Sequence, residues 1–214
     1  MRVHPWLVIV SVLLCATGID GAAPEPDIDD TRVNITANTR VAVHVYAQSM
    51  VLNQDDERIA LDVAKKVFAT ASLDLAWTLC LPGICVTPSS EALKLRIVMS
   101  SDRGEPSSRV LGQSLIDSRA RAGVLATVFI DRTRRLAQDL ATDYRTLLGR
   151  AIAHELGHLL LGTSTHSVGL MREIWSHDEL LGARPADWVL APPDAAIIRE
   201  RLARRGNGRV GGAS

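Results

Sequence analysis

The sequence predicts a domain of the α+β class, in which one five-stranded sheet is combined with two long helices. Two kinds of pattern carry this prediction. Five short segments have the alternating or continuously apolar character of strands, and two longer segments place apolar residues at helical spacing. The chain has 214 residues, of which 47% are hydrophobic. It is therefore long enough to bury one core, and too apolar to be disordered as a whole.

The first strand and the first helix have the clearest patterns. Residues 40–46 alternate, with valines on one face and His44 on the other, where a structural role is expected for this histidine rather than a ligand role. A helix is predicted at about 55–71, because its apolar residues follow an i, i+3, i+4 stripe. Asp55 and Asp56 stand where acidic side chains favour a helix N-terminus.

Four more strands complete the predicted sheet. The third of them is the weakest because it contains a glycine, and the last is apolar enough to be a buried strand. A long helix then follows, with Gly162 as its stop residue, and a shorter helix lies near the C-terminus. The strands are predicted at about 75–80, 95–99, 110–116 and 123–130, and the helices at about 143–161 and 194–204.

The N-terminus has the layout of a secretory signal peptide. Residues 1–23 contain an early arginine, an apolar run and then small residues, in that order. A buried N-terminal strand or helix is the alternative. Residues 24–38 are rich in proline and acidic side chains, which predicts a flexible leader. The folded domain is then expected at 39–205 and a disordered tail at 206–214, in a secreted or periplasmic protein.

Cleavage of the signal peptide would resolve an odd cysteine count. Cys15 would leave with the signal, so the mature chain would keep Cys80 and Cys85. Two cysteines in an oxidising compartment predict one disulfide between them. Two free buried thiols are the alternative, and a zinc site built on this pair alone is not expected.

The net charge of the chain limits the classes of partner that it is expected to bind. There are 24 Lys and Arg residues and 24 Asp and Glu residues, so the net charge is zero. This balance argues against a nucleic-acid partner, which would require an excess of basic side chains. No apolar stretch reaches the roughly 18–20 residues of a membrane span. We therefore expect no membrane span in the mature chain, which we predict to be a monomer.

The long predicted helix contains the pattern His154-Glu155-Leu156-Gly157-His158. His154 and His158 are four residues apart, so both imidazoles leave the same helical face and can share one Zn²⁺. Glu155 would then reach a water in the open position of the metal and act as a general base. An accidental pattern on a surface helix is the alternative, but the apolar neighbours of Glu155 predict a buried carboxylate, which is costly without a task.

Catalytic zinc usually has three protein ligands, and the third one is His166 or a later residue. His166 is the first candidate after the helix, between Gly162 and a Gly-Leu-Met turn. His177, or a carboxylate ligand from Glu173 or Glu179, is the alternative.

With His154, Glu155, His158, His166 and the following Met171, the sequence resembles the metzincins. These are secreted zinc peptidases such as the astacins, matrixins and adamalysins, and the resemblance is greatest to small secreted bacterial members. The family signature places its glycine three residues and its third histidine six residues after the second histidine. Here Gly162 is four and His166 is eight residues after His158.

The resemblance implies a fold and a set of roles. The fold would be a twisted, mixed five-stranded sheet packed on two long helices, with the zinc-binding helix followed by a Met-turn and a short C-terminal helical subdomain. His154, His158 and His166 would be the zinc ligands, Glu155 the general base and Met171 the structural residue of the Met-turn. Arg172 is a candidate to stabilise the oxyanion, with a surface or ion-pairing role as its alternative.

The expected function is hydrolysis of peptide bonds in a peptide or protein substrate, by a zinc metalloendopeptidase. The resemblance also implies that the substrate lies antiparallel to the 110–116 strand, at an edge of the sheet. A secreted zinc-binding domain without catalysis is the main alternative. A protein without a metal, in which the motif arose by chance, is the other.

Overall fold

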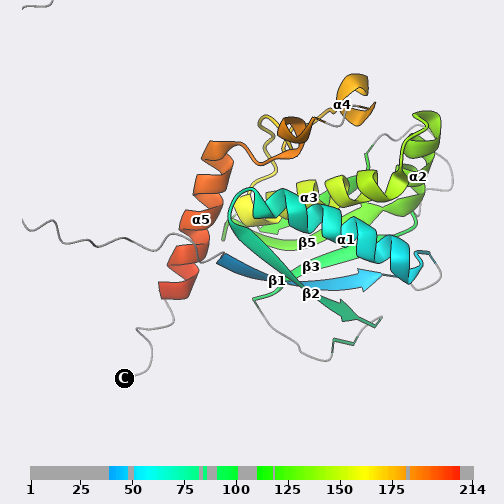
Figure 1. The fold of residues 1–214 in the computed structure, drawn as a ribbon. Helices are drawn as coiled ribbons and strands as arrows, with labels where there is room; N and C mark the ends of the chain where they lie inside the picture. The colour runs from blue at the N-terminus through cyan, green and yellow to red at the C-terminus, as the bar shows by residue number, and fades with distance from the viewer. Residues whose placement is uncertain are drawn as a thin grey trace, which may run out of the picture. The chain divides into compact units, whose positions relative to one another are not determined.

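The sheet of this protein is mixed, and its strands follow the spatial order β2-β1-β3-β5-β4 (Figure 1). Neighbouring strands are parallel except for β4, which runs antiparallel to β5 and forms one edge. The strand predicted at 110–116 is therefore an edge strand, although it begins two residues later than expected. The strands are β1 (Thr39–Ala47), β2 (Leu73–Cys80), β3 (Leu93–Val98), β4 (Gly112–Asp117) and β5 (Ala122–Phe129).

The computed structural model describes residues 39–47, 51–81, 84–85, 91–100, 110–117, 119–181 and 184–207. The predicted signal peptide and leader lie outside the described residues. So do residues 208–214, which make up most of the predicted tail. Within the described residues, no helix combines the length and the apolar character that crossing a membrane requires.

Two long helices cover one face of the sheet (Figure 1). Helix α1 spans Gln54–Ala69 and begins where the Asn53 side chain accepts a hydrogen bond from the Asp56 N–H at 2.8 Å. Helix α3 spans Tyr144–Leu161 and is capped by Asp143. The main apolar core lies between the two helices and the sheet and includes fully buried side chains from both layers, namely Phe68, Leu73, Leu75, Leu95, Ile97, Leu148, Ile152, Leu156 and Leu159. This is the fold class that the sequence predicted.

Helix α2 (Ile130–Asp139) is an element that the sequence patterns did not reveal. It follows β5 without a connecting loop, and its N-cap residue Phe129 makes no side-chain capping hydrogen bond. Its buried stripe is short and partly polar, because Arg132 and Thr133 are among the buried residues. Ile130, Leu136 and Ala137 do recur at helical spacing on one face, but no capping residue separates the helix from β5, which it follows directly.

The C-terminal segment returns to the end of α3. It contains α4 (His177–Leu181), a 3₁₀ turn (Pro185–Trp188) and α5 (Pro192–Asn207). From α5, Arg201 donates hydrogen bonds to the carbonyl oxygens of Leu161, at 2.5 Å, and of Arg121. The guanidinium of Arg201 thus connects the C-terminal end of α3 to the turn that precedes β5.

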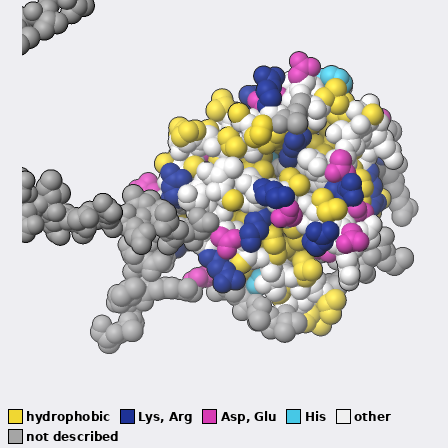
Figure 2. All heavy atoms as spheres, in the orientation of Figure 1, with side chains coloured by type: hydrophobic (Ala, Val, Ile, Leu, Met, Phe, Trp, Pro, Cys, Tyr) yellow, Lys and Arg dark blue, Asp and Glu magenta, His cyan; other side chains and the backbone are white. Residues whose placement is uncertain are grey.

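The surface carries charges of both signs. On the face shown in Figure 2, Lys and Arg side chains are interspersed with Asp and Glu side chains rather than gathered in separate fields. This face therefore produces no extended electrostatic field of one sign.

Candidate metal centre

Helix α3 presents His154 and His158 on one face, one turn apart. Their Nε2 atoms lie 3.1 Å from each other, and their ring centroids are 4.7 Å apart. Both side chains are buried, in a helix whose residues 151–161 are all buried. Two imidazole nitrogens are therefore held close together at the wall of the core.

Backbone carbonyls determine which nitrogen of each ring is available. His154 Nδ1 lies 2.8 Å from the carbonyl oxygen of Leu170, and His158 Nδ1 lies 2.9 Å from that of Thr163. A carbonyl oxygen only accepts hydrogen bonds, so both Nδ1 atoms must carry the proton. Each Nε2 then has a free lone pair, which is the tautomer that a metal requires.

Burial also keeps both rings neutral. It lowers the pKa of His154 to about 4, and it lowers the pKa of His158. Two uncharged Nε2 atoms that face each other at 3.1 Å have no proton to share, so their lone pairs repel. A cation between them would remove this repulsion, and the arrangement fits a metal ion better than it fits an apolar core.

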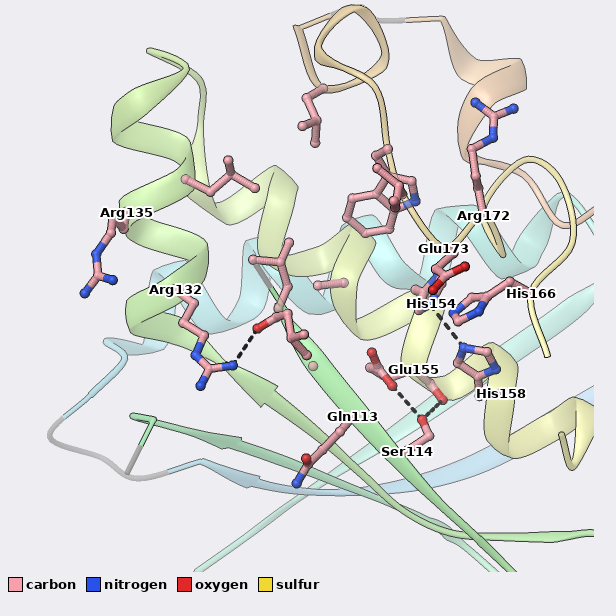
Figure 3. A pocket seen from close by; sticks show the side chains of 18 of the residues that line it. Gln113, Ser114, Arg132, Arg135, His154, Glu155, His158, His166, Arg172 and Glu173 are labelled. Carbon is pink, nitrogen blue, oxygen red and sulfur yellow. Dashed lines mark hydrogen bonds between the residues drawn. The ribbon is translucent and has the colours of Figure 1, made fainter. Parts of the chain in front are cut away.

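His166 completes a group of three imidazoles. It lies in the loop after α3, and its ring centroid is 4.9 Å from that of His158 and 5.4 Å from that of His154. One nitrogen from each of the three residues lies within 4.8 Å of the others, which is close enough to hold one metal ion. Figure 3 shows the three rings directed toward one another beside Glu155. Three histidine ligands with an open fourth position are typical of catalytic zinc.

The other predicted ligands do not join this group in the part of the chain that the structure describes. Glu179 is buried, accepts a hydrogen bond from the Ser176 N–H at 2.7 Å and forms an ion pair with Arg172. His177 lines the same cleft from α4, and Glu173 is exposed at its rim. Arg172 therefore has the ion-pairing role that was the alternative to oxyanion stabilisation.

A tight turn places Met171 under the histidine-bearing helix. Gly169 has a left-handed φ of +64°. The carbonyl oxygen of Gly169 accepts a hydrogen bond from the Arg172 N–H at 3.2 Å. Met171 is fully buried. A Cβ placed on Gly157, between the two α3 histidines, would lie 2.4 Å from Met171 Sδ. The glycine inside the motif thus lets the methionine approach the helix directly beneath the histidines.

Gly157→Ala should therefore destabilise the protein by about 1–3 kcal/mol, because the added methyl group overlaps the Met171 sulfur. Met171→Ala alone should also be destabilising, since it leaves a cavity. Combined in one chain, the two substitutions should cost clearly less than the sum of the single effects, because the smaller residue 171 makes room for the methyl group. Urea unfolding of the four proteins measures this coupling, and strictly additive effects would contradict the contact.

Glu155 lies in the cleft beside the histidines and is held by the edge strand. Its side chain is buried, and Ser114 Oγ on β4 lies 2.7 Å from its carboxylate oxygen Oε2. Burial raises the pKa of Glu155 to about 7, although the hydrogen bond from Ser114 acts in the opposite direction. A carboxylate with a pKa near neutrality can both accept and release a proton at physiological pH.

The raised pKa makes the stability of the metal-free protein depend on pH. At pH values between about 4.5 and about 7, the folded state retains the proton on Glu155, whereas the unfolded state loses it. The stabilising contribution is complete below about 4.5 and is lost as the pH rises through about 7, by on the order of 3 kcal/mol. Glu155→Gln cannot lose this proton. Relative to the wild type, we therefore expect this variant to become more stable by that amount between pH 4.5 and 8.

Denaturant unfolding in the presence of a chelator, at several pH values, measures this difference. Other titrating groups are common to both proteins and cancel. A difference that stays constant over this range would show that Glu155 titrates normally in the folded protein.

The histidines and Glu155 open into a cleft of about 960 Å³. Strand β4 forms one wall, α2 forms another, and the segment after Met171 forms a third (Figure 3). The apolar part of its lining comes largely from the latter two elements and includes Leu136, Leu140, Ile174, Trp175 and Leu180. The cleft is large enough for an extended segment of another molecule.

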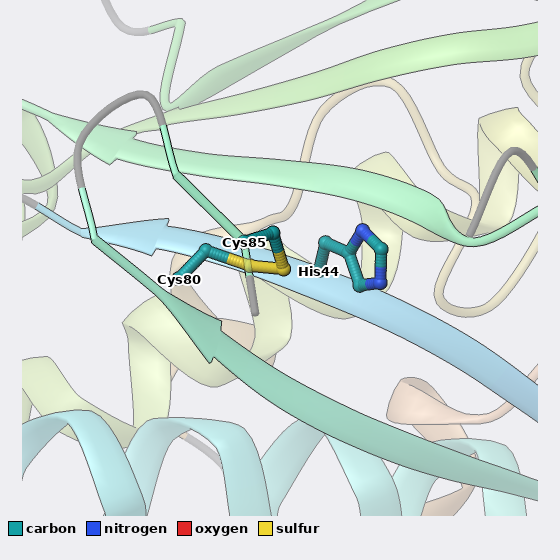
Figure 4. Close-up of side chains that lie close together, drawn as sticks. All are labelled: His44, Cys80 and Cys85. Atoms are coloured by element: carbon teal, nitrogen blue, oxygen red, sulfur yellow. A yellow bond between two sulfur atoms is a disulfide. The ribbon is translucent and has the colours of Figure 1, made fainter. Parts of the chain in front are cut away.

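Cys80 and Cys85 form a disulfide with a Cα–Cα distance of 4.6 Å. The buried ring of His44 lies beside it (Figure 4). Potential ligand atoms of these three residues lie within 4.8 Å of one another, so a histidine is near the pair in space although none is near it in sequence. The sulfur atoms of a disulfide are not thiolates, and the group therefore does not form a metal site in this state.

Comparison with known proteins supports the fold. The structure is similar to that of archaemetzincin from Methanopyrus kandleri, with a TM-score of 0.50 and 16% identity over 77% of this chain and 97% of the other. It also matches metalloproteinase-II from Bacteroides fragilis, with a TM-score of 0.47 and 12% identity over 77% of this chain and 54% of the other. The sequence matches no protein-family model, and comparison with the curated proteins gives no match. The chain thus shares the overall fold of archaemetzincin.

Two residues of the site are not recognisable from the sequence. Ser114 and Gly112 stand about forty positions before Glu155, in a strand whose pattern is weak. A Cβ on Gly112 would lie 2.7 Å from both Cγ and Oε1 of Glu155. Only the packing of β4 against α3 brings these residues to the Glu155 carboxylate, and no local sequence pattern indicates that contact.

Proposed function

We propose that this protein is a secreted zinc metallopeptidase of the metzincin type. The observation that carries the proposal is the convergence of three imidazoles on one point, beside a buried carboxylate in a large cleft. His154, His158 and His166 are the zinc ligands, and Met171 supports them from beneath. The donor set suits Zn²⁺, which readily accepts nitrogen ligands in a tetrahedral arrangement.

Zinc at this position would supply Lewis-acid chemistry toward a substrate carbonyl. The residues of the chain have separate tasks in the reaction. Glu155 removes a proton from the attacking water and later delivers it to the amine that leaves. Its raised pKa suits both steps, since a strongly acidic carboxyl group would not accept the proton readily. The carbonyls of Leu170 and Thr163 hold the histidine rings in the tautomer that leaves Nε2 free.

The substrate is a peptide segment that binds along β4. One side of this strand pairs with β5, and the other side is an edge of the sheet. An edge strand can form main-chain hydrogen bonds with an extended peptide, as in other cases of strand addition. Ser114 and Gly112 bring this edge next to Glu155, so a peptide on β4 would pass directly by the catalytic carboxylate. We expect the peptide to run antiparallel to β4.

Secretion is supported by two features. The N-terminal sequence has the order of a signal peptide, and the Cys80–Cys85 disulfide is typical of an oxidising compartment. The mature enzyme is proposed to be a monomer.

The direct test is metal analysis combined with a cleavage assay on the mature protein. The purified protein should contain one zinc per chain and cleave members of a peptide library, as detected by mass spectrometry. Chelation should stop cleavage, and added zinc should restore it. Bound zinc without cleavage would instead indicate a zinc-binding domain that is not an enzyme. A protein that binds no zinc would show that the motif arose by chance.

A further inference from the structure

We propose that Ser114 on the edge strand is a positioning residue for Glu155, and that it determines where the catalytic carboxylate points. This inference rests on the proposed peptidase function. It assigns a task to a residue that no sequence motif includes.

The first argument is the hydrogen bonding of Ser114. Its Oγ lies 2.7 Å from Oε2 of Glu155 and 2.8 Å from the backbone carbonyl oxygen of the same residue. One hydroxyl group thus contacts both ends of one glutamate and ties its side chain to its own backbone (Figure 3). A glutamate side chain has three rotatable bonds, so this contact removes freedom that the carboxylate would otherwise retain.

The second argument is the space left by Gly112. This residue is two positions before Ser114, on the same face of β4. A Cβ at Gly112 would lie 2.7 Å from Oε1 and 2.9 Å from Cδ of Glu155. The carboxylate therefore occupies the place where a side chain of the strand would be. Gly112 gives it room, and Ser114 bonds to it from the adjacent position on the same face.

The third argument is the chemistry of a hydroxyl group. A serine has one proton to donate and lone pairs that accept. It can donate to the ionised carboxylate. The single hydroxyl proton can also be donated to the backbone carbonyl oxygen of Glu155. Both acceptors belong to Glu155, so either orientation of the O–H bond ties Ser114 to this residue.

The geometry therefore assigns to β4 a second task besides substrate binding. A base must lie within hydrogen-bond reach of the proton it removes, and displacement by about 1 Å can reduce the rate on the order of 100-fold. Ser114→Ala removes the hydroxyl contact and leaves the metal ligands untouched. We expect this variant to lose about 10- to 100-fold in kcat, with zinc content and KM close to those of the wild type.

Three variants make the test specific. Ser114→Thr keeps the hydroxyl group and should restore most of kcat. Gly112→Ala should lower kcat by pushing the carboxylate from its place. Ser100→Ala is the matched control, because Ser100 Oγ makes a similar hydrogen bond of 2.5 Å to Asp131 and neither residue lines the cleft. It should leave kcat and KM unchanged, whatever it does to the stability.

A crystal structure of the zinc-loaded Ser114→Ala protein gives a readout that does not depend on activity. The Glu155 carboxylate should leave its position beside residue 114 or occupy more than one rotamer. An unmoved carboxylate, or an unchanged kcat, would overturn the inference. A raised KM with unchanged kcat would also overturn it, since Ser114 would then bind substrate instead. If the wild type itself cleaves no peptide, the proposed function fails, whereas the carboxylate position still decides the role of Ser114.

Discussion

Glu155→Gln should reduce peptide cleavage by about 10²- to 10⁴-fold in kcat and leave zinc binding intact. The size of the effect is that of losing a general base. Glutamine has nearly the same shape as glutamate but cannot take a proton from water. Because Glu155 is not part of the histidine group that can hold the metal, its replacement removes the base without removing a ligand. Glu155→Ala should lose activity to a similar or greater extent.

The measurement combines steady-state kinetics with the zinc content of the purified variants. Glu173→Gln is the matched control, since Glu173 is a nearby exposed carboxylate at the same cleft that does not join the histidine group. It should keep its zinc and most of its activity. An active Glu155→Gln protein would eliminate this residue as the base and leave the proposed mechanism without a proton acceptor.

Loss of His166 should produce the second large effect. His166→Ala should weaken zinc binding by about 100-fold or more, since even residues that only support metal ligands commonly contribute 10- to 100-fold. The stability that zinc confers at a fixed concentration should fall with it, by about 2.7 kcal/mol for a 100-fold change. Competition with a chromophoric chelator measures the affinity. Thermal unfolding with and without zinc measures the stability.

His177→Ala is the control for this prediction. His177 lines the same cleft from α4, but it does not belong to the group of three histidines. Its removal should therefore leave the zinc affinity within a few-fold of the wild type. If His177→Ala lost the metal and His166→Ala retained it, the third ligand would be His177, and the loop after α3 would have to rearrange on metal binding.

The two effects depend on a scaffold that several distant segments build together. The histidine rings take their tautomers from Leu170 and Thr163, which follow the end of α3. The end of that helix is in turn held by Arg201 from α5. Stabilising contacts of this kind lie far from the chemistry, but they determine whether the ligands are already in place when a metal arrives.

Local patterns in the sequence were sufficient for much of the fold. Alternation predicts β1 because its valines pack against the helices while neighbouring residues face the other way. An apolar stripe with acidic residues at its start predicts α1, and a long apolar segment that ends at Gly162 predicts α3. Both kinds of signal act over a few residues, which is why they can be read without knowing the fold. Helix α2 has an apolar face but no capping residue, and because it follows β5 directly, the sequence patterns did not separate it from that strand.

For the site, the sequence by itself determined the spacing of His154, Glu155 and His158 on one helix, because helical geometry places positions i and i+4 on one face. It left several candidates for a third ligand. The tertiary structure brings His166 to the other two histidines and engages Glu179 with Arg172 instead. It also brings Ser114 and Gly112 to Glu155. The physical reason is that such contacts join segments far apart in the chain, and only the packing of strand against helix decides which side chains meet.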